Sequence, residues 1–104
     1  MKIIAVTACP SGVAHTYMAA ESLKVAAEES KVCESCFVET QGQIGIEDAL
    51  SPTQIQAADV VILTNDIGIK NEERFKGKPV LRVHAGDLIN KSPIIIEKLA
   101  QKLA

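Results

Sequence analysis

A short apolar run near the start of the chain is followed at once by turn residues and then by a helical pattern. The run IIAVT at residues 3–7 is rich in β-branched side chains, Pro10 and Gly12 interrupt the chain after it, and a helical pattern starts near Tyr17. An apolar run bounded by Pro and Gly is typical of a strand, whereas small and apolar residues at helical spacing indicate a helix. The order strand, turn, helix restricts the chain to folds in which helices pack on a sheet.

The same alternation continues along the rest of the chain. The segment at residues 59–64 is apolar without interruption from Val60 to Leu63, which is the pattern of a strand covered on both faces. Further strands are expected at residues 37–40 and 78–83, and helices at residues 17–28, 51–58 and 92–103.

Two pairs of residues predict where helices begin. Ser51 and Pro52, followed by Gln54, have the pattern of a capping box with Pro at the first helical position. Ser92 and Pro93 are expected to cap the last helix in the same way. The buried stripe of that helix is predicted to consist of Ile95, Ile96, Leu99 and Leu103.

These elements predict one α/β domain that spans residues 1–104. We expect a three-layer fold with a four-stranded parallel open sheet, in the strand order 2-1-3-4, and helices on both faces. Ligands of such sheets bind beyond the carboxyl ends of the strands, where the winding direction reverses. That point lies between the first and third strands, so the loop after residue 8 is expected to face residues 64–68. Gly42 and Gly45 permit tight turns beside the same edge.

Charge and composition exclude several classes of partner. The 104 residues carry a formal net charge of −2, with acidic and basic residues interspersed. We therefore expect no nucleic-acid surface and no polybasic membrane anchor. The first apolar run is too short for a secretion signal or a membrane span, so a cytoplasmic protein is expected. No metal-ligand cluster is evident, and no cofactor is expected.

Cys9 is the candidate nucleophile. It opens the turn between the first strand and the first helix, where unpaired backbone N–H groups meet the positive end of the helix dipole. A thiol in this position ionises more easily, and main-chain donors would hold a phosphoryl group attached to it. The alternative is a buried Cys that only closes a strand. The predicted phosphate-binding loop consists of Pro10, Ser11, Gly12, Val13, Ala14, His15 and Thr16, and its rim consists of Gln41, Gly42, Asn65 and Asp66.

The sixth residue after Cys9 separates two kinds of chemistry. Low-molecular-weight tyrosine phosphatases have the pattern C-x₅-R, in which the Arg clamps the phosphate with two parallel hydrogen bonds. His15 occupies that position here and supplies no permanently charged fork. Slow hydrolysis of the phosphorylated thiol is what a phosphoryl carrier needs. His15 either contacts the phosphoryl group directly or is only a residue of the first helical turn.

Cys33 and Cys36 have C-x-x-C spacing. A structural zinc site needs four ligands, and no second pair of ligands with suitable spacing exists in the chain. A thioredoxin-like motif follows a strand and begins a helix, whereas this pair follows a helix and leads into a strand. The spacing is therefore interpreted as incidental, with adventitious metal binding or oxidation as the alternative.

Several blocks of the sequence, in order, resemble the fructose-type enzyme IIB domains of the bacterial phosphoenolpyruvate-dependent sugar phosphotransferase system. The similarity runs over nearly the whole chain and is most specific in TACPSGVAHTYMAAE at residues 7–21. Ser11 stands where the family usually has Thr, and Val13 where it usually has Ile. The stretch at residues 33–36 departs more and lacks a Gly often found before the second strand. The other matching blocks are VETQG at 38–42, ADVVI at 58–62, Asp66, and RFKGK at 74–78.

The resemblance implies a phosphoryl carrier of sugar uptake. Cys9 would accept a phosphoryl group from phosphohistidine on a IIA partner, form phosphocysteine, and donate the group to a fructose-like sugar bound by a membrane IIC partner. The domain would then lie at the inner face of the membrane through IIC. Because the chain ends at Ala104 without a IIA or IIC segment, both partners are expected to bind in trans, unless the chain is an excised domain.

Two other functions stay open at this point. A regulatory module of the same fold would bind phosphate or a partner without needing a nucleophile, so the presence of Cys9 disfavours it. A small phosphatase is disfavoured by His15. Arg74, Lys76 and Lys78 either steer an acidic partner surface or form a solvated charge cluster.

Overall fold

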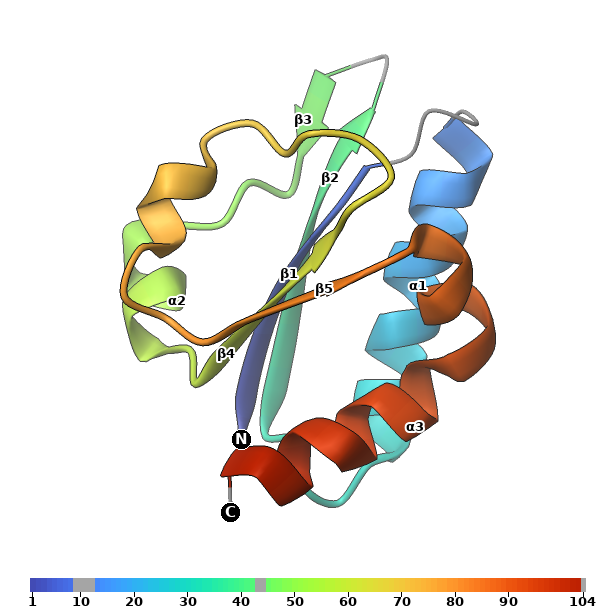
Figure 1. The fold of residues 1–104 in the computed structure, drawn as a ribbon, viewed down its shortest axis with the longest axis vertical. Coiled ribbons are helices and arrows are strands. Elements are labelled where there is room, and N and C mark those ends of the chain that lie inside the picture. Colours follow the sequence, from blue (N-terminus) through green and yellow to red (C-terminus); the bar gives the residue numbers. More distant parts are fainter. Residues whose placement is uncertain (9–12, 43–44, 104) are drawn as a thin grey trace.

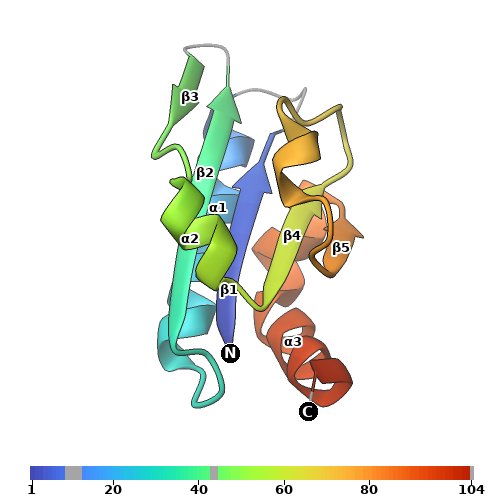
Figure 2. The same ribbon diagram turned by 90° about the vertical axis from the view of Figure 1, so that its left-hand side faces the viewer.

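The computed structural model describes residues 1–8, 13–42 and 45–103, without the side chains of residues 13 and 103. A central sheet carries α1 and α3 on one face and α2 with the short 3₁₀ helix η1 on the other (Figures 1 and 2). The elements in chain order are β1 (Lys2–Thr7), α1 (Val13–Glu29), β2 (Ser35–Gly42), β3 (Gly45–Glu47), α2 (Pro52–Ala57), β4 (Val60–Thr64), η1 (Glu72–Phe75), β5 (Val80–Val83) and α3 (Ala85–Leu103).

The sheet is mixed and has five strands in the order β3-β2-β1-β4-β5. β1 pairs in parallel with β2 and β4, and β4 pairs in parallel with β5. β3 pairs antiparallel with β2, with Gly42 opposite Gly45, whose φ of +113° suits a glycine. The predicted sheet of four parallel strands in the order 2-1-3-4 is therefore wrong, because residues 45–47 add an antiparallel edge strand. The predicted α/β class, with helices on both faces, is confirmed.

The central strand β1 packs against both outer layers. Ile3 and Ala5 belong to the apolar cluster under α1 and α3, whereas Ile4 and Val6 pack with residues that include Leu50 and Phe75 on the opposite face. Both clusters also take alternate residues of β4, which explains the continuous apolar pattern of that strand.

The helices begin earlier than the sequence pattern predicts, except for α2. α2 has the predicted capping box: the Ser51 hydroxyl accepts from the Gln54 N–H at 3.1 Å, and the Gln54 side chain accepts from the Ser51 N–H at 2.9 Å. α1 begins at Val13 rather than near Tyr17, because Ala14, His15 and Thr16 already have helical geometry.

The last helix begins at Ala85, not at Ser92. Lys91 interrupts it with φ −133° and ψ 17°, and the Ser92 hydroxyl donates to the Leu88 carbonyl. Pro93 has no N–H to continue the helical ladder, so Ser92 and Pro93 mark a kink rather than a start. In the predicted stripe Ile96 and Leu99 are buried and Ile95 is half-buried. No described helix is long and apolar enough to cross a lipid bilayer.

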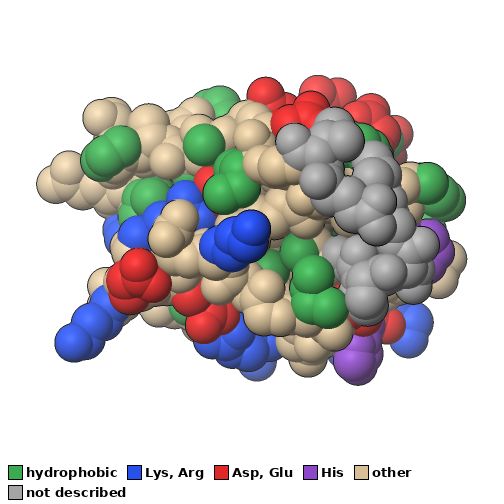
Figure 3. Space-filling model, turned by 90° about the horizontal axis from the view of Figure 1, so that it is seen from above, with side chains coloured by type: hydrophobic (Ala, Val, Ile, Leu, Met, Phe, Trp, Pro, Cys, Tyr) green, Lys and Arg blue, Asp and Glu red, His purple; other side chains and the backbone are tan. Residues whose placement is uncertain are grey.

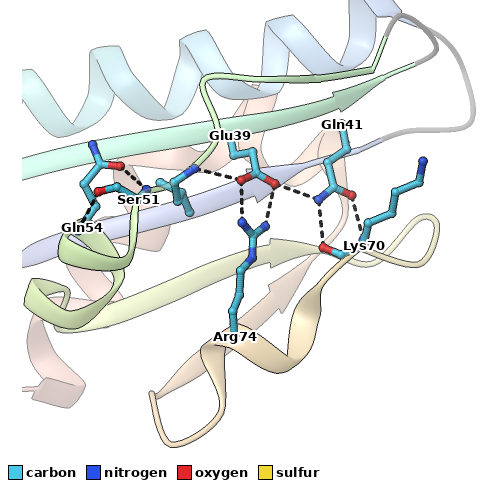
Figure 4. A network of polar contacts seen from close by, with 7 residues as sticks. Glu39, Gln41, Ser51, Gln54, Lys70 and Arg74 are labelled. Carbon is cyan, nitrogen blue, oxygen red and sulfur yellow. Dashed lines mark hydrogen bonds and ion pairs between the residues drawn. The ribbon is translucent and has the colours of Figure 1, made fainter.

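A buried ion pair attaches the segment between β4 and β5 to the sheet. The Arg74 guanidinium in η1 donates to both carboxylate oxygens of Glu39 in β2, at 2.8 and 2.6 Å (Figure 4). The same guanidinium lies over the Phe75 ring, 4.7 Å from its centroid. The Leu50 N–H donates to the same carboxylate at 3.0 Å. Glu39 is fully buried. Burial alone raises the pKa of Glu39, but hydrogen bonds from Arg74, Gln41 and the Leu50 N–H, with the Arg74 charge, outweigh it and hold this pKa below its ordinary value.

Removal of the Arg74 charge is predicted to destabilise the fold strongly. Arg74→Met keeps a long apolar stem but leaves the buried Glu39 carboxylate without its cation, which costs roughly 3–5 kcal/mol. Urea denaturation at neutral pH measures the loss. Because the folded-state pKa of Glu39 is lowered, the stabilisation is present above the unfolded carboxyl pKa of about 4.3 and is lost as the pH falls through the folded value. The difference between wild type and variant should therefore shrink in acid.

Arg82→Met is the matched control. Arg82 forms an exposed ion pair with Glu72, so its removal should change the urea midpoint little. Equal losses of unfolding free energy in Arg74→Met and Arg82→Met would contradict the role given to the buried ion pair.

Candidate functional site

The candidate site lies where β1 and β4 end at their carboxyl termini. Cys9, Pro10, Ser11 and Gly12, which the sequence predicts as nucleophile and phosphate-binding loop, lie outside the described residues. The residues on both sides of this segment are described, and they define the frame that holds its two ends.

Two buried threonine hydroxyls form that frame. The Thr64 hydroxyl at the end of β4 accepts from the Ala8 N–H at 2.9 Å and donates to the Ala8 carbonyl at 3.0 Å. The Thr7 hydroxyl at the end of β1 donates to the Thr16 carbonyl in the first turn of α1 at 3.2 Å. Both side chains are fully buried. The end of β1 is thus tied to its neighbouring strand on one side and to the following helix on the other.

The N-terminus of α1 adds an electrostatic element. The helix begins at Val13 and has no acidic residue in its first turn, so the positive end of a 17-residue helix is not neutralised by its own side chains. Of the predicted loop residues in this turn, Ala14 and His15 are exposed and Thr16 is buried. A helix terminus of this kind favours a dianionic group placed before it.

The segment that follows β4 also reaches this edge, where it contacts Gln41 of β2. Gln41 in β2 is buried, and its amide nitrogen donates to Glu39 at 2.9 Å and to the Lys70 carbonyl at 3.1 Å. Its amide oxygen accepts from the Lys70 N–H at 2.8 Å (Figure 4). The Gln41 side chain, predicted to lie at the rim, thus contacts the main chain of the segment after β4.

The other predicted rim residues, Asp66, Asn65 and Gly42, contact parts of the chain other than the Lys70 main chain that Gln41 binds. Asp66 accepts from the Ala85 N–H at 2.7 Å, which satisfies the start of α3, and its second oxygen lies 3.3 Å from Nδ1 of His84. Asn65 is exposed, and its N–H donates to the Val83 carbonyl at 2.8 Å. Gly42 is half-buried in the β2–β3 pair. Seen from above, this end of the molecule carries basic, acidic and apolar side chains together (Figure 3).

Sequence reasoning assigned two basic residues differently from the structure. Arg74, considered for steering a partner, is paired with Glu39, and the Lys78 ammonium donates to the carbonyls of Gln56 and Ala58 at 2.8 Å each. Lys76 is exposed. Thr64 was not singled out, although a polar residue that ends an apolar strand beside a candidate loop was the available signal.

The C-x-x-C pair has the properties of ordinary structural thiols. Cys33 and Cys36 are free and partly buried. Burial is the main cause that raises the pKa of Cys33 and raises that of Cys36 to about 12. Thiolates are therefore scarce at both positions near neutral pH, and no cluster of metal-binding side chains is found in the described part of the chain.

Comparison with known proteins assigns the family. Residues 4–98 match the family described as "PTS system, Lactose/Cellobiose specific IIB subunit". The chain is 56% identical over 103 residues to the "PTS system fructose-like EIIB component 2" of Escherichia coli K12, covering 99% of this chain and 95% of that protein.

Two solved structures have the same fold. A domain of the fructose-specific IIABC component of Borrelia burgdorferi has a TM-score of 0.87 and 48% identity, with 96% of this chain and 93% of that one covered. The solution structure of a IIB subunit of the phosphotransferase system from Escherichia coli K12 has a TM-score of 0.90 and 34% identity, with 98% and 93% covered. The chain therefore belongs to the IIB family of the sugar phosphotransferase system, whose members are phosphotransferases.

Proposed function

We propose that this chain is the phosphoryl carrier of a fructose-like sugar uptake system, with Cys9 as the group that carries the phosphoryl. The observation that supports this most directly is the frame around residues 9–12. The Thr7 and Thr64 hydroxyls hold the end of β1, and the unneutralised N-terminus of α1 follows. A nucleophile and a dianion both benefit from such a position.

The transfer has two steps. The Cys9 thiolate attacks the phosphorus of a phosphohistidine on the IIA partner, so that a P–S bond forms, the P–N bond breaks and the histidine leaves with its electron pair. A sugar hydroxyl bound by the membrane IIC partner then attacks the same phosphorus and loses its proton to a base in that complex. The P–S bond breaks, and the thiolate is restored for the next cycle.

The partners are inferred from relatives in which IIB is joined to other components. The names of two of them, an EIIB'BC component of Xanthomonas campestris and an EIIABC component of Escherichia coli, include further parts of the same system. We propose that the present chain meets IIA and IIC at the exposed edge beyond the strand ends, on the cytoplasmic side of the membrane. A single sulfur must reach both partners, which favours an open rim over a deep cavity.

Replacement of the nucleophile tests the proposal. Cys9→Ser should keep its fold and accept no phosphoryl group from a phosphorylated IIA protein, because a serine hydroxyl is hardly ionised near neutral pH. Circular dichroism checks the fold, and intact-protein mass spectrometry counts attached phosphoryl groups. Cys36→Ser is the control and should be phosphorylated as wild type. Transfer to Cys9→Ser at the wild-type rate would refute the assignment.

A second experiment separates a carrier from a phosphatase. With His15 in the position of a guanidinium clamp, the protein should hydrolyse an aryl phosphate negligibly while taking up one phosphoryl group from phosphorylated IIA. Release of aryl alcohol over many turnovers, without uptake from IIA, would favour the phosphatase instead.

The threonine frame makes a third prediction. Thr64→Val keeps the shape of the side chain but removes the hydroxyl that bonds to the Ala8 N–H and carbonyl. The loss of these bonds lowers the free energy of unfolding by about 1–3 kcal/mol. We expect slower phosphoryl acceptance because the end of β1 is less firmly held. Thr64→Ser retains the hydroxyl and should stay close to wild type in the same rapid-quench assay. Unchanged acceptance by Thr64→Val would show that the hydroxyl does not support transfer.

A further inference from the structure

The segment that follows β4 crosses the end of β1. β1 lies between β2 and β4 in the sheet. The segment begins beside Ala8 at Thr64, bonds to β5 and to the start of α3 through Asn65 and Asp66, and then reaches β2 through Lys70 and Arg74. Residues 65–70, here called the crossing segment, therefore pass from one neighbour of β1 to the other, at the edge where β1 leads into residue 9 (Figure 4).

The position of Lys70 in this segment is closely determined. Its N–H and its carbonyl both bond to the Gln41 amide, at 2.8 and 3.1 Å, and Gln41 is buried. Asn71 follows with φ 60° and ψ 37°, a left-handed conformation that Asn tolerates and that turns the chain into η1. Arg74 then holds η1 to Glu39. The main chain of Lys70 is thus fixed from two sides.

The Lys70 side chain has a different environment from the basic groups beside it. Arg74 is paired with Glu39, and Lys78 is bonded to two carbonyls. Lys70 is exposed, and no carboxylate of the described residues lies within ion-pair distance of its ammonium. In Figure 4 the Lys70 side chain points away from Gln41, which contacts the Lys70 main chain, and extends along the edge at which the strands end.

Two carboxylates near this edge already have partners. Glu39 is neutralised by Arg74, and Asp66 is engaged by the Ala85 N–H and faces His84. The Lys70 charge is therefore free to act on an incoming anion. An ammonium is a point charge without the planar fork of a guanidinium, so it attracts a dianion without clamping its oxygens in transition-state geometry.

We propose that Lys70 is a phosphate-binding residue of the site and that Gln41 is the positioning residue that keeps it there. The ammonium would contribute part of the positive charge that the C-x₅-H sequence lacks. This inference rests on the proposed function for its biological meaning, but the binding of phosphate is tested without phosphoryl transfer.

Protection of Cys9 from alkylation by inorganic phosphate tests the proposal. Iodoacetamide labelling is followed by peptide mass spectrometry, which separates Cys9 from Cys33 and Cys36, at several phosphate concentrations and low salt. Lys70→Gln should need about fivefold more phosphate for half-protection, as expected for one exposed charge contact. The difference should shrink in high salt, because exposed charges are screened.

Three further variants separate charge, position and general effects. Lys70→Arg keeps the charge, so phosphate should protect its Cys9 at the same concentration as in wild type. Gln41→Met removes the bonds to the Lys70 main chain and should shift half-protection in the same direction as Lys70→Gln, with its fold checked by circular dichroism. Lys98→Gln makes the same charge change at an exposed position in the C-terminal half of α3 and should change nothing.

The outcomes distinguish this inference from the proposed function. If Lys70→Gln is protected by phosphate as wild type at low salt, the inference is overturned, whatever the protein does with phosphorylated IIA. If protection weakens as described while wild type accepts no phosphoryl group from IIA, the phosphate site stands and the carrier function is refuted. An equal increase in the phosphate concentration for half-protection in Lys98→Gln would also overturn the inference, since the effect would then reflect net charge alone.

Discussion

The arrangement of the whole β4-to-β5 connection depends on one buried carboxylate. Glu39 lies on a central part of β2 with no exposed surface, and an ion in that position is tolerated only if its lone pairs and its charge are matched. Arg74, Gln41 and the Leu50 N–H supply those partners from three parts of the chain. The same contacts that compensate the carboxylate draw η1 and the entry to α2 onto one face of the sheet. An apolar residue at this position would offer no hydrogen-bond acceptor to Arg74 or to the Leu50 N–H.

The frame of the site combines this network with two hydroxyls, one at the end of β1 and one at the end of β4. Thr64 binds both main-chain groups of Ala8, and Thr7 binds the first turn of α1. Hydroxyls suit this task because each one donates and accepts, so a single small side chain can satisfy a strand end that has no further strand partner. The described residues that flank the proposed reactive segment, Ala8 and the first turn of α1, are thereby attached to regular elements.

Part of this architecture follows from local sequence rules and part does not. The first strand and the first helix, the capping box of Ser51 and Gln54, and the doubly covered strand β4 are local patterns, and the structure contains them. Strand β3 has three residues and no alternation, so its pairing with β2 could not be read from periodicity. The kink at Lys91 was read as a start because Ser followed by Pro has the same signature in both cases.

The candidate site shows the same division. A candidate nucleophile between a strand and a helix can be proposed from the sequence, because the two periodicities meet there. The Glu39 and Arg74 pair spans 35 residues, and the Gln41 and Lys70 contacts span 29, so no local rule connects them. From the sequence alone Arg74 is therefore expected to be a surface charge, whereas its ion pair with the buried Glu39 gives it a structural role.

The proposed distribution of positive charge would suit a phosphoryl group that is accepted and then given away. A guanidinium fork in the loop would hold the phosphoryl oxygens in both the resting and the transition state and would speed attack by water. Backbone donors and a helix terminus stabilise the bound dianion by smaller amounts and do not select a transition-state geometry. Lys70 in the proposed role would add an attraction that salt screens and that a partner's own charges could replace during docking. In such a site the partners, rather than the loop itself, would determine when the P–S bond breaks.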